Sequence, residues 1–175
     1  SVNKYYSLIY HSISMNSILE KVKDLKNMAL LKNQLISTAE SCTGGLVAKY
    51  ITDIQGSSSF YESSVVTYSN SSKISLLNVS SKTLSDYGAV SEQVVKEMCR
   101  GLLNISSANI TLSISGIMGP ASDSTSKKIG STWICVMNEF KSKTTYIELS
   151  GSRSKNREEA AKIAIMNLYD FINDL

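Results

Sequence analysis

The stretch from Leu35 to Leu46, LISTAESCTGGL, decides how the chain is expected to fold. It opens with apolar and β-branched residues, ends in Ser-Cys-Thr-Gly-Gly, and is followed by apolar residues at helical spacing. This pattern predicts a strand that passes through a tight turn into a helix, with Ser41 at the strand exit and the helix beginning near Thr43 or Gly44. Backbone N–H groups at the start of such a helix are expected to face whatever binds beside Ser41.

The turn after Ser41 favours a small substrate that is anionic or becomes anionic during a reaction. Gly44 and Gly45 let a ligand approach the main chain closely, because neither residue carries a Cβ. The hydroxyl of Thr43 has a simpler interpretation as the N-cap of the helix, and many serines in such turns do no more than cap a helix. The turn is therefore either a ligand-binding turn or an ordinary capped helix start.

The composition narrows the class of protein. The chain has 175 residues, 42% of them hydrophobic and 19% charged, which fits one globular domain. A net charge of +3 without a basic stripe argues against a nucleic-acid partner. No apolar run approaches the roughly 20 residues of a membrane helix, so no membrane partner is expected. The three cysteines, at 42, 99 and 135, lack metal-like spacing and fit a reducing cytoplasm, where we expect the protein to work.

The scarcity of histidine limits the possible chemistry. His11 is the only histidine, and it lies far upstream of the patterned region. This argues against a Ser-His-Asp triad, against Cys-His catalysis and against a His-ligated metal. An enzyme with a nucleophile in this chain would need a lysine or a carboxylate as its base, and we expect no metal and no cofactor.

The order of the predicted elements indicates the fold class. Residues 1–14 show no clear period and are interpreted as an N-terminal extension of unknown role, with a capping box at 17–20 opening the first helix. Six helices are predicted: one at 17–31, one that follows the Ser41 turn and ends at about 53, two short ones at 72–77 and 81–87, one that begins at Ser91, and one at 154–173. Five strands are predicted, at 35–40, 63–68, 109–115, 131–137 and 144–149. Alternating strands and helices followed by a hairpin and a helix predict an α/β fold, a three-layer α/β/α sandwich with a mixed, mostly parallel sheet.

Three polar turns are expected to meet at one edge of this sheet. Right-handed crossovers leave the carboxyl ends of neighbouring parallel strands on the same edge, where ligands bind in open α/β sheets. Ser41, Tyr68 and Ser115 stand at three such ends. A substrate site is therefore predicted between them.

Lys73 follows the second of these strand ends and is a candidate base for Ser41. To act near neutral pH its pKa must fall from about 10.4 to about 7 or 8, which desolvation and the positive helix end can supply. Tyr68 is a candidate for orienting the pair by a hydrogen bond. The alternative is an ordinary solvated lysine. Cys42 is intrinsically the better nucleophile, but only one of two adjacent side chains can face the ligand.

Four motifs together resemble the C-terminal domain of the CinA family: AESCTGG (39–45), VVTYSNSSK (65–73), GAVSEQV (88–94) and SGIMGP (115–120). The resemblance spans about residues 17–173 and implies that 15–175 form a single amidohydrolase domain. It implies hydrolysis of the carboxamide of nicotinamide mononucleotide to nicotinic acid mononucleotide and ammonia, without metal, by a serine–lysine pair. The matching positions are Ser41 and Lys73. The implied partners are a small nucleotide substrate and further copies of the chain in a homo-oligomer.

The resemblance also implies roles around the pair. Backbone N–H groups from Thr43 to Gly45 would hold the oxyanion, and Ser115, Gly116 and Gly119 would line the substrate site. The substrate phosphate would be bound by Arg153 and Arg157, which lie one turn apart at the start of the last helix. The alternative for this pair is that Glu158, Glu159 or a neighbouring subunit neutralises it.

One departure from the family pattern keeps a second function open. The loop at 121–128 reads ASDSTSKK where the family is usually glycine-rich, and Ser115 stands where the family commonly has threonine. A catalytically weak or inactive nucleotide-binding domain of the same fold is the alternative function, because a fold does not guarantee its chemistry. Phosphatase chemistry at the same serine would call for a cluster of metal-binding carboxylates, and none stands out in the sequence.

Overall fold

The structure is a computed structural model that describes residues 15–121 and 126–175, so the predicted extension at 1–14 lies outside the described residues. Its helices are α2 (Met15–Leu31), α3 (Leu46–Thr52), α4 (Asn70–Leu77), α5 (Ser81–Tyr87), α6 (Glu92–Ile105) and α7 (Arg153–Asn173), with a short 3-10 turn at Ser57–Ser59. Its strands are β1 (Ile36–Glu40), β2 (Tyr61–Val66), β3 (Ile110–Gly116), β4 (Ser131–Met137) and β5 (Ser142–Glu148). In the described part of the chain, no helix combines the length and apolar character that a membrane crossing needs.

The five strands form one mixed sheet in the order β2-β1-β3-β4-β5. β1 pairs in parallel with both β2 and β3, whereas the β3–β4 and β4–β5 pairs are antiparallel. The predicted mixed α/β sheet is confirmed, but the prediction that it is mostly parallel is wrong. The reason is that hydrogen bonds just beyond β3 align β4 against it in the opposite direction: Ile117 N–H donates to Ser131 O (2.9 Å), and Gly130 N–H donates to Ile117 O (2.6 Å).

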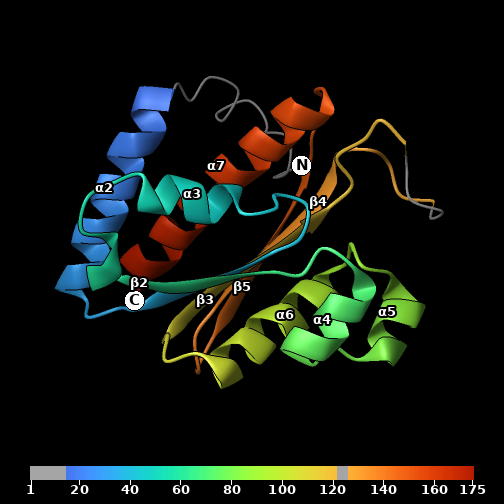
Figure 1. The fold of residues 1–175 in the computed structure, drawn as a ribbon, viewed down its shortest axis with the longest axis horizontal. Coiled ribbons are helices and arrows are strands. Elements are labelled where there is room, and N and C mark those ends of the chain that lie inside the picture. The colour runs from blue at the N-terminus through green and yellow to red at the C-terminus, as the bar shows by residue number, and fades with distance from the viewer. Residues whose placement is uncertain (1–14, 122–125) are drawn as a thin grey trace.

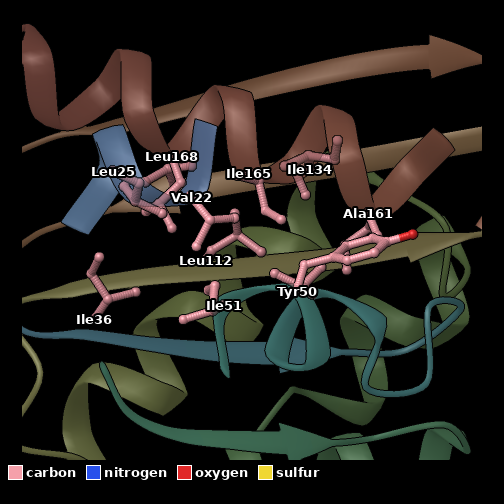
Figure 2. Close-up of a cluster of buried hydrophobic side chains, with 14 of the residues drawn as sticks. Val22, Leu25, Ile36, Tyr50, Ile51, Leu112, Ile134, Ala161, Ile165 and Leu168 are labelled. Carbon is pink, nitrogen blue, oxygen red and sulfur yellow. The ribbon is translucent and has the colours of Figure 1, made fainter. Parts of the chain in front are cut away.

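Helices cover both faces of the sheet, as Figure 1 shows. α2, α3 and α7 lie on one face, and α4, α5 and α6 lie on the other. The larger core lies beneath α2, α3 and α7, where Figure 2 shows their side chains meeting those of β1, β3 and β4. An apolar stripe of α7 is buried in this core and consists of Ala161, Ala164, Ile165, Leu168, Phe171 and Ile172. Removal of this apolar surface from water holds the helical layer on the sheet.

The opposite face is built around α6. Its predicted start at Ser91 is confirmed, because the Ser91 side chain accepts a hydrogen bond from Val94 N–H at the first turn. An apolar stripe of α6 faces the sheet, with Val94, Val95, Met98, Cys99 and Leu102 buried. α4 and α5 pack beside α6 and cover the β1–β2 side of the same face.

Several predicted boundaries are corrected. α2 begins at Met15, so Ser17 lies inside the helix and the predicted capping box is wrong. α3 begins at Leu46 rather than near Thr43, because Gly44 (φ +59°) and Gly45 (φ +101°) take the left-handed conformation and cannot belong to the helix. β2 ends at Val66 and leaves Tyr68 in the following turn.

Candidate active site

Ser41 leaves the end of β1 with its side chain on the α4 side of the sheet. Its backbone N–H donates to Ile114 O (3.0 Å), which continues the parallel pairing with β3 for one residue beyond the strand. The side chain is buried, and its Oγ lies 3.0 Å from Nζ of Lys73 on α4. Residues 32 positions apart are thus brought within hydrogen-bonding distance.

Lys73 is held in place by α4 and by the turn that precedes it. Ser69 caps α4 by accepting from Ser72 N–H (3.1 Å), and Lys73 then points back under the sheet edge with 1% of its surface exposed. Nζ donates to Thr67 O (2.8 Å) and Tyr68 O (3.4 Å) as well as to Ser41 Oγ. All three partners are uncharged oxygens, so the ammonium loses hydration without gaining a counter-ion. Burial lowers the pKa of Lys73 to about 8, which excludes the alternative of an ordinary solvated lysine.

Cys42 faces the other way. Its side chain lies in the core beneath α3 and α7. Burial raises the pKa of this thiol to about 12, so the sulfur stays protonated near neutral pH and is a poor nucleophile. The choice between the two adjacent side chains therefore falls on Ser41.

Glu40 is a functional residue that the sequence reasoning missed. It is fully buried on the α3 side of the sheet, and its carboxylate accepts from Gly45 N–H (3.0 Å), Val47 N–H (3.1 Å) and Ala48 N–H (2.8 Å). The Thr43 hydroxyl donates to the same carboxylate (2.6 Å) and so does not cap the helix itself. The signal for this role was an acidic residue at the end of a buried strand, just before a turn whose amides need an acceptor.

This carboxylate corrects the prediction that free amides after Ser41 face a ligand. Gly45 N–H is bound by Glu40, and Gly44 N–H donates to Ser41 O (3.1 Å). In the parts of the chain that the structure describes, the N–H groups of Cys42 and Thr43 donate to no acceptor on another residue. These two amides are the ones that remain for a ligand at Ser41.

Glu40→Ala is expected to destabilise the fold strongly. The change leaves the buried Val47 N–H and Thr43 hydroxyl, and the part-buried N–H groups of Gly45 and Ala48, without their acceptor. A buried group left in this way costs about 1–3 kcal/mol. We expect the free energy of unfolding, measured by urea denaturation, to fall by about 3–5 kcal/mol, as when one partner of a buried charged network is removed. Glu40→Gln, which keeps one acceptor oxygen, serves as the matched control and should lose less. A fall below about 1 kcal/mol for the alanine variant would contradict the capping role.

The predicted substrate-lining residues of β3 make contacts within the protein. Ser115 is buried and its Oγ donates to Ala89 O (2.9 Å), on the same side of the sheet as Ser41. Gly116 is needed for packing, because a Cβ there would lie 2.5 Å from Thr132 Oγ1. Gly119 has φ +87° and presents its carbonyl to Arg153. Their roles toward a substrate stay predictions.

Tyr68 does not orient the pair through its hydroxyl as predicted. Its side chain is 60% exposed, and its hydroxyl accepts from Arg153 Nη2 (2.7 Å). The reason is that β2 ends two residues earlier, so the ring turns outward while the main chain stays beside the lysine. The backbone carbonyls of Thr67 and Tyr68 hold Lys73 instead.

The two arginines of α7 are placed differently. Arg153 is exposed and links Tyr68 to Gly119, whose carbonyl accepts from Nη1 (2.8 Å). Arg157 is half-buried and donates from Nε to Cys42 O (3.1 Å) and from Nη2 to Thr43 O (2.9 Å). Arg157 is therefore bound to two carbonyl oxygens, and Arg153 to one carbonyl oxygen and the Tyr68 hydroxyl. Within the described residues, neither guanidinium forms an ion pair with Glu158 or Glu159.

The structure thus brings Ser41, Lys73, the backbone at Tyr68 and both arginines to one edge of the sheet. Within residues 15–121 and 126–175, no group of three or more histidine, cysteine, aspartate or glutamate side chains is arranged to hold a metal ion. His11 and residues 122–125 of the altered loop lie outside the described residues.

Comparisons with known proteins show the family of the chain. A family model described as the CinA C-terminal domain matches residues 19–172. Nicotinamide-nucleotide amidohydrolase PncC of Enterobacter agglomerans is 44% identical over 145 residues, which are 82% of this chain and 88% of that protein. A CinA-like protein of Endomicrobium trichonymphae is 43% identical over 78% of this chain, which spans 32% of that longer protein. The crystal structure of a competence-damaged protein (CinA) superfamily protein from Klebsiella pneumoniae superposes with a TM-score of 0.87 and 28% identity, over 90% of this chain and 99% of that one.

Proposed function

The chain belongs to the CinA C-terminal domain family, and from this premise we propose that it is an amidohydrolase that converts nicotinamide mononucleotide to nicotinic acid mononucleotide and ammonia. The observation that carries the proposal is the buried Lys73 Nζ at 3.0 Å from Ser41 Oγ. A domain that only binds nucleotides has no need of a base with a lowered pKa beside a hydroxyl. The names of the similar amidohydrolases supply the substrate class.

In the proposed first step, Ser41 attacks the carboxamide carbon. Neutral Lys73 accepts the hydroxyl proton through its lone pair while its two N–H groups stay bonded to the carbonyls of Thr67 and Tyr68. The carbonyl oxygen of the amide becomes an oxyanion, and we propose that the N–H groups of Cys42 and Thr43, which have no acceptor on another described residue, bind it. One such donor contributes about 3–4 kcal/mol to catalysis.

In the second step, the tetrahedral intermediate collapses and releases ammonia. The Lys73 ammonium donates its proton to the departing nitrogen, which leaves an ester between Ser41 and the nicotinate carbon. Lys73, neutral again, then takes a proton from water, and the hydroxide attacks the ester. The proton returns to Ser41 as the acid product leaves, so the pair ends as it began.

The rate of hydrolysis is expected to depend on pH through Lys73. The neutral amine is the reactive form, and its pKa of about 8 means that protonation blocks the reaction below that pH. We expect kcat/KM to rise about tenfold per pH unit below the pKa and to level off above it. A profile measured from acid to alkaline pH that stays flat through this region would contradict the role of Lys73 as base.

Arg153 is the better candidate for the substrate phosphate, because it is exposed at the edge of the site while Arg157 is bound to the turn. Arg153→Met should raise KM for nicotinamide mononucleotide about 10- to 100-fold, the effect of one lost charge-assisted hydrogen bond, and leave kcat nearly unchanged. Nicotinamide riboside, which lacks the phosphate, serves as the control substrate and should show no such change. An unaltered KM for the nucleotide would remove Arg153 from the phosphate site.

A single assay tests the proposed function against its alternative. Ammonia release from nicotinamide mononucleotide is measured with and without a chelator. Release that the chelator does not affect supports the amidohydrolase, and loss of release with chelator would contradict the metal-independent mechanism. Nucleotide binding without release would support a non-catalytic binding domain. The altered loop at 121–128 is the feature that favours this alternative.

We further infer that the protein works in a reducing cytoplasm as a homo-oligomer. Cys42, Cys99 and Cys135 are all free and buried, which suits a reducing compartment. The homo-oligomer rests on the family resemblance, and sedimentation velocity on the purified chain tests it.

A further inference from the structure

We propose that Arg157 is a positioning residue that orients the Thr43 amide toward the oxyanion, and that it is not a ligand of the substrate phosphate. The inference rests on the proposed function, because it concerns the acyl transfer at Ser41. It starts from two contacts that join the first turns of α7 to the turn between β1 and α3.

The first contact fixes one peptide plane. Arg157 Nε donates to Cys42 O at 3.1 Å. In a trans peptide the N–H points opposite to the C=O, so the Thr43 N–H of the same peptide points away from Arg157 and α7. Among the described residues this N–H donates to no acceptor. Arg157 therefore orients the Thr43 N–H, which has no acceptor among these residues, away from α7.

The second contact fixes the next peptide. Arg157 Nη2 donates to Thr43 O at 2.9 Å, and on the other edge of that peptide Gly44 N–H donates to Ser41 O at 3.1 Å. The planar guanidinium thus holds two successive carbonyls, a geometry that a lysine ammonium cannot reproduce. The peptide between Thr43 and Gly44 closes the turn on Ser41 O. The peptide between Cys42 and Thr43 keeps its N–H without an acceptor among the described residues.

Gly44 gives this arginine the space that it needs. The residue has φ +59°, and a Cβ built there would lie 3.1 Å from Arg157 Nη2. A side chain at this position would press on the guanidinium and strain the backbone at once. The sequence suggested that Gly44 leaves room for a ligand to approach the main chain. In the structure this room is taken by the Arg157 guanidinium.

The charge of Arg157 adds to the effect of its position. A cation bound to a carbonyl oxygen draws electron density toward that oxygen and makes the N–H of the same peptide a stronger donor. In a partly buried turn the positive charge also stabilises any anion that forms nearby. A cation in the first turns of α7 is opposed by the helix dipole, so this location disfavours arginine unless specific contacts compensate.

The test compares two substrates in three variants. In Arg157→Met we expect kcat to fall about 100-fold, near the effect of losing one oxyanion donor, with little change in KM. The fall should be the same for nicotinamide mononucleotide and for nicotinamide riboside. Arg157→Lys, which keeps the charge without the planar fork, should recover only part of the loss. Lys155→Met, which removes an exposed cation from the same end of α7, is the matched control and should leave kcat and KM nearly unchanged. A loss seen with the nucleotide alone, or only in KM, would show a phosphate ligand and overturn the proposal.

A second readout separates this proposal from the proposed function. Acetylation of Ser41 by p-nitrophenyl acetate passes through an oxyanion but involves neither a pyridine ring nor a phosphate. We expect Arg157→Met to slow it by a similar factor, as measured by mass spectrometry, even if the native chain releases no ammonia from nicotinamide mononucleotide. Ser41 acetylation at the native rate in a variant with native thermal stability would overturn the positioning role. If Arg157→Met fails to fold, Arg157→Gln, which retains one donor, replaces it under the same criteria.

Discussion

Ser41→Ala is expected to abolish ammonia release from nicotinamide mononucleotide, with kcat reduced about 10⁴-fold or more. The variant removes the side-chain oxygen that lies 3.0 Å from the buried Lys73 amine. The methyl group of alanine fits the same space, so the fold should be retained, which circular dichroism and thermal unfolding check. Nucleotide binding should persist, because no proposed substrate contact other than the nucleophile is removed.

Two matched variants identify the nucleophile. Ser41→Cys should keep a trace of activity, since a thiol at this position still lies beside Lys73. Cys42→Ala should keep turnover, because that thiol lies in the core with its pKa raised to about 12 by burial. Full activity in Ser41→Ala together with an inactive Cys42→Ala would move the nucleophile by one residue.

Lys73→Met is the second change with a very large expected effect. It removes the proton acceptor, so kcat should fall at least about 10³-fold, within the range seen when a general base is deleted. Lys73→Arg is the matched control: it keeps a long cationic side chain that cannot lose its proton, and it should be equally inactive. Activity in Lys73→Arg would show that the positive charge, rather than a neutral amine, serves the reaction.

Lys73→Met also tests the lowered pKa of Lys73, because that pKa makes the stability of the native protein depend on pH. Burial lowers the pKa of Lys73 from 10.5 to about 8, so the unfolded chain binds more protons than the native chain between these values. The free energy of unfolding of the native protein therefore increases as the pH rises from about 8 to 10.5, because the buried Lys73 ammonium loses its proton. Below about pH 8 the full cost of burying the charged ammonium remains. Relative to Lys73→Met, the native protein should thus become more stable as the pH rises from about 8 to above 10. Urea denaturation of both proteins across this interval measures the difference. A constant difference would mean that Lys73 has an ordinary pKa.

The sequence was informative where one local pattern determined the outcome. The helix at 154–173 and the start of α6 at Ser91 were predicted because helical periodicity and capping depend on neighbouring residues alone. The approach of Lys73 to Ser41 followed from the rule that parallel strands end on one edge. The motif resemblance reached the same two residues independently.

The remaining features depend on which way a side chain points after folding. Glu40 caps α3 because the alternation of β1 turns it to the side opposite Ser41. An acidic residue at the end of a buried strand is a weak signal, and only the fold shows that its carboxylate reaches the amides of the helix that follows. Arg157 looked like a phosphate ligand because the sequence gives only its spacing from Arg153. The strand β4 was predicted, but its antiparallel pairing with β3 was not, because the hydrogen bonds of Ile117 with Gly130 and Ser131 that align the two strands form only in the folded chain.

The alternation of β1 has a consequence for how the domain can change. Glu40, Ser41 and Cys42 are consecutive in sequence but have separate roles. Glu40 caps α3, Ser41 forms the proposed reacting pair with Lys73, and Cys42 packs in the core beneath α7. Adding or deleting one residue within β1 would exchange the faces and bring a carboxylate toward Lys73, where an ion pair would keep the amine protonated and inactive. Length variation in this domain should therefore accumulate in its loops, while the count of residues in β1 stays as fixed as the residues that react.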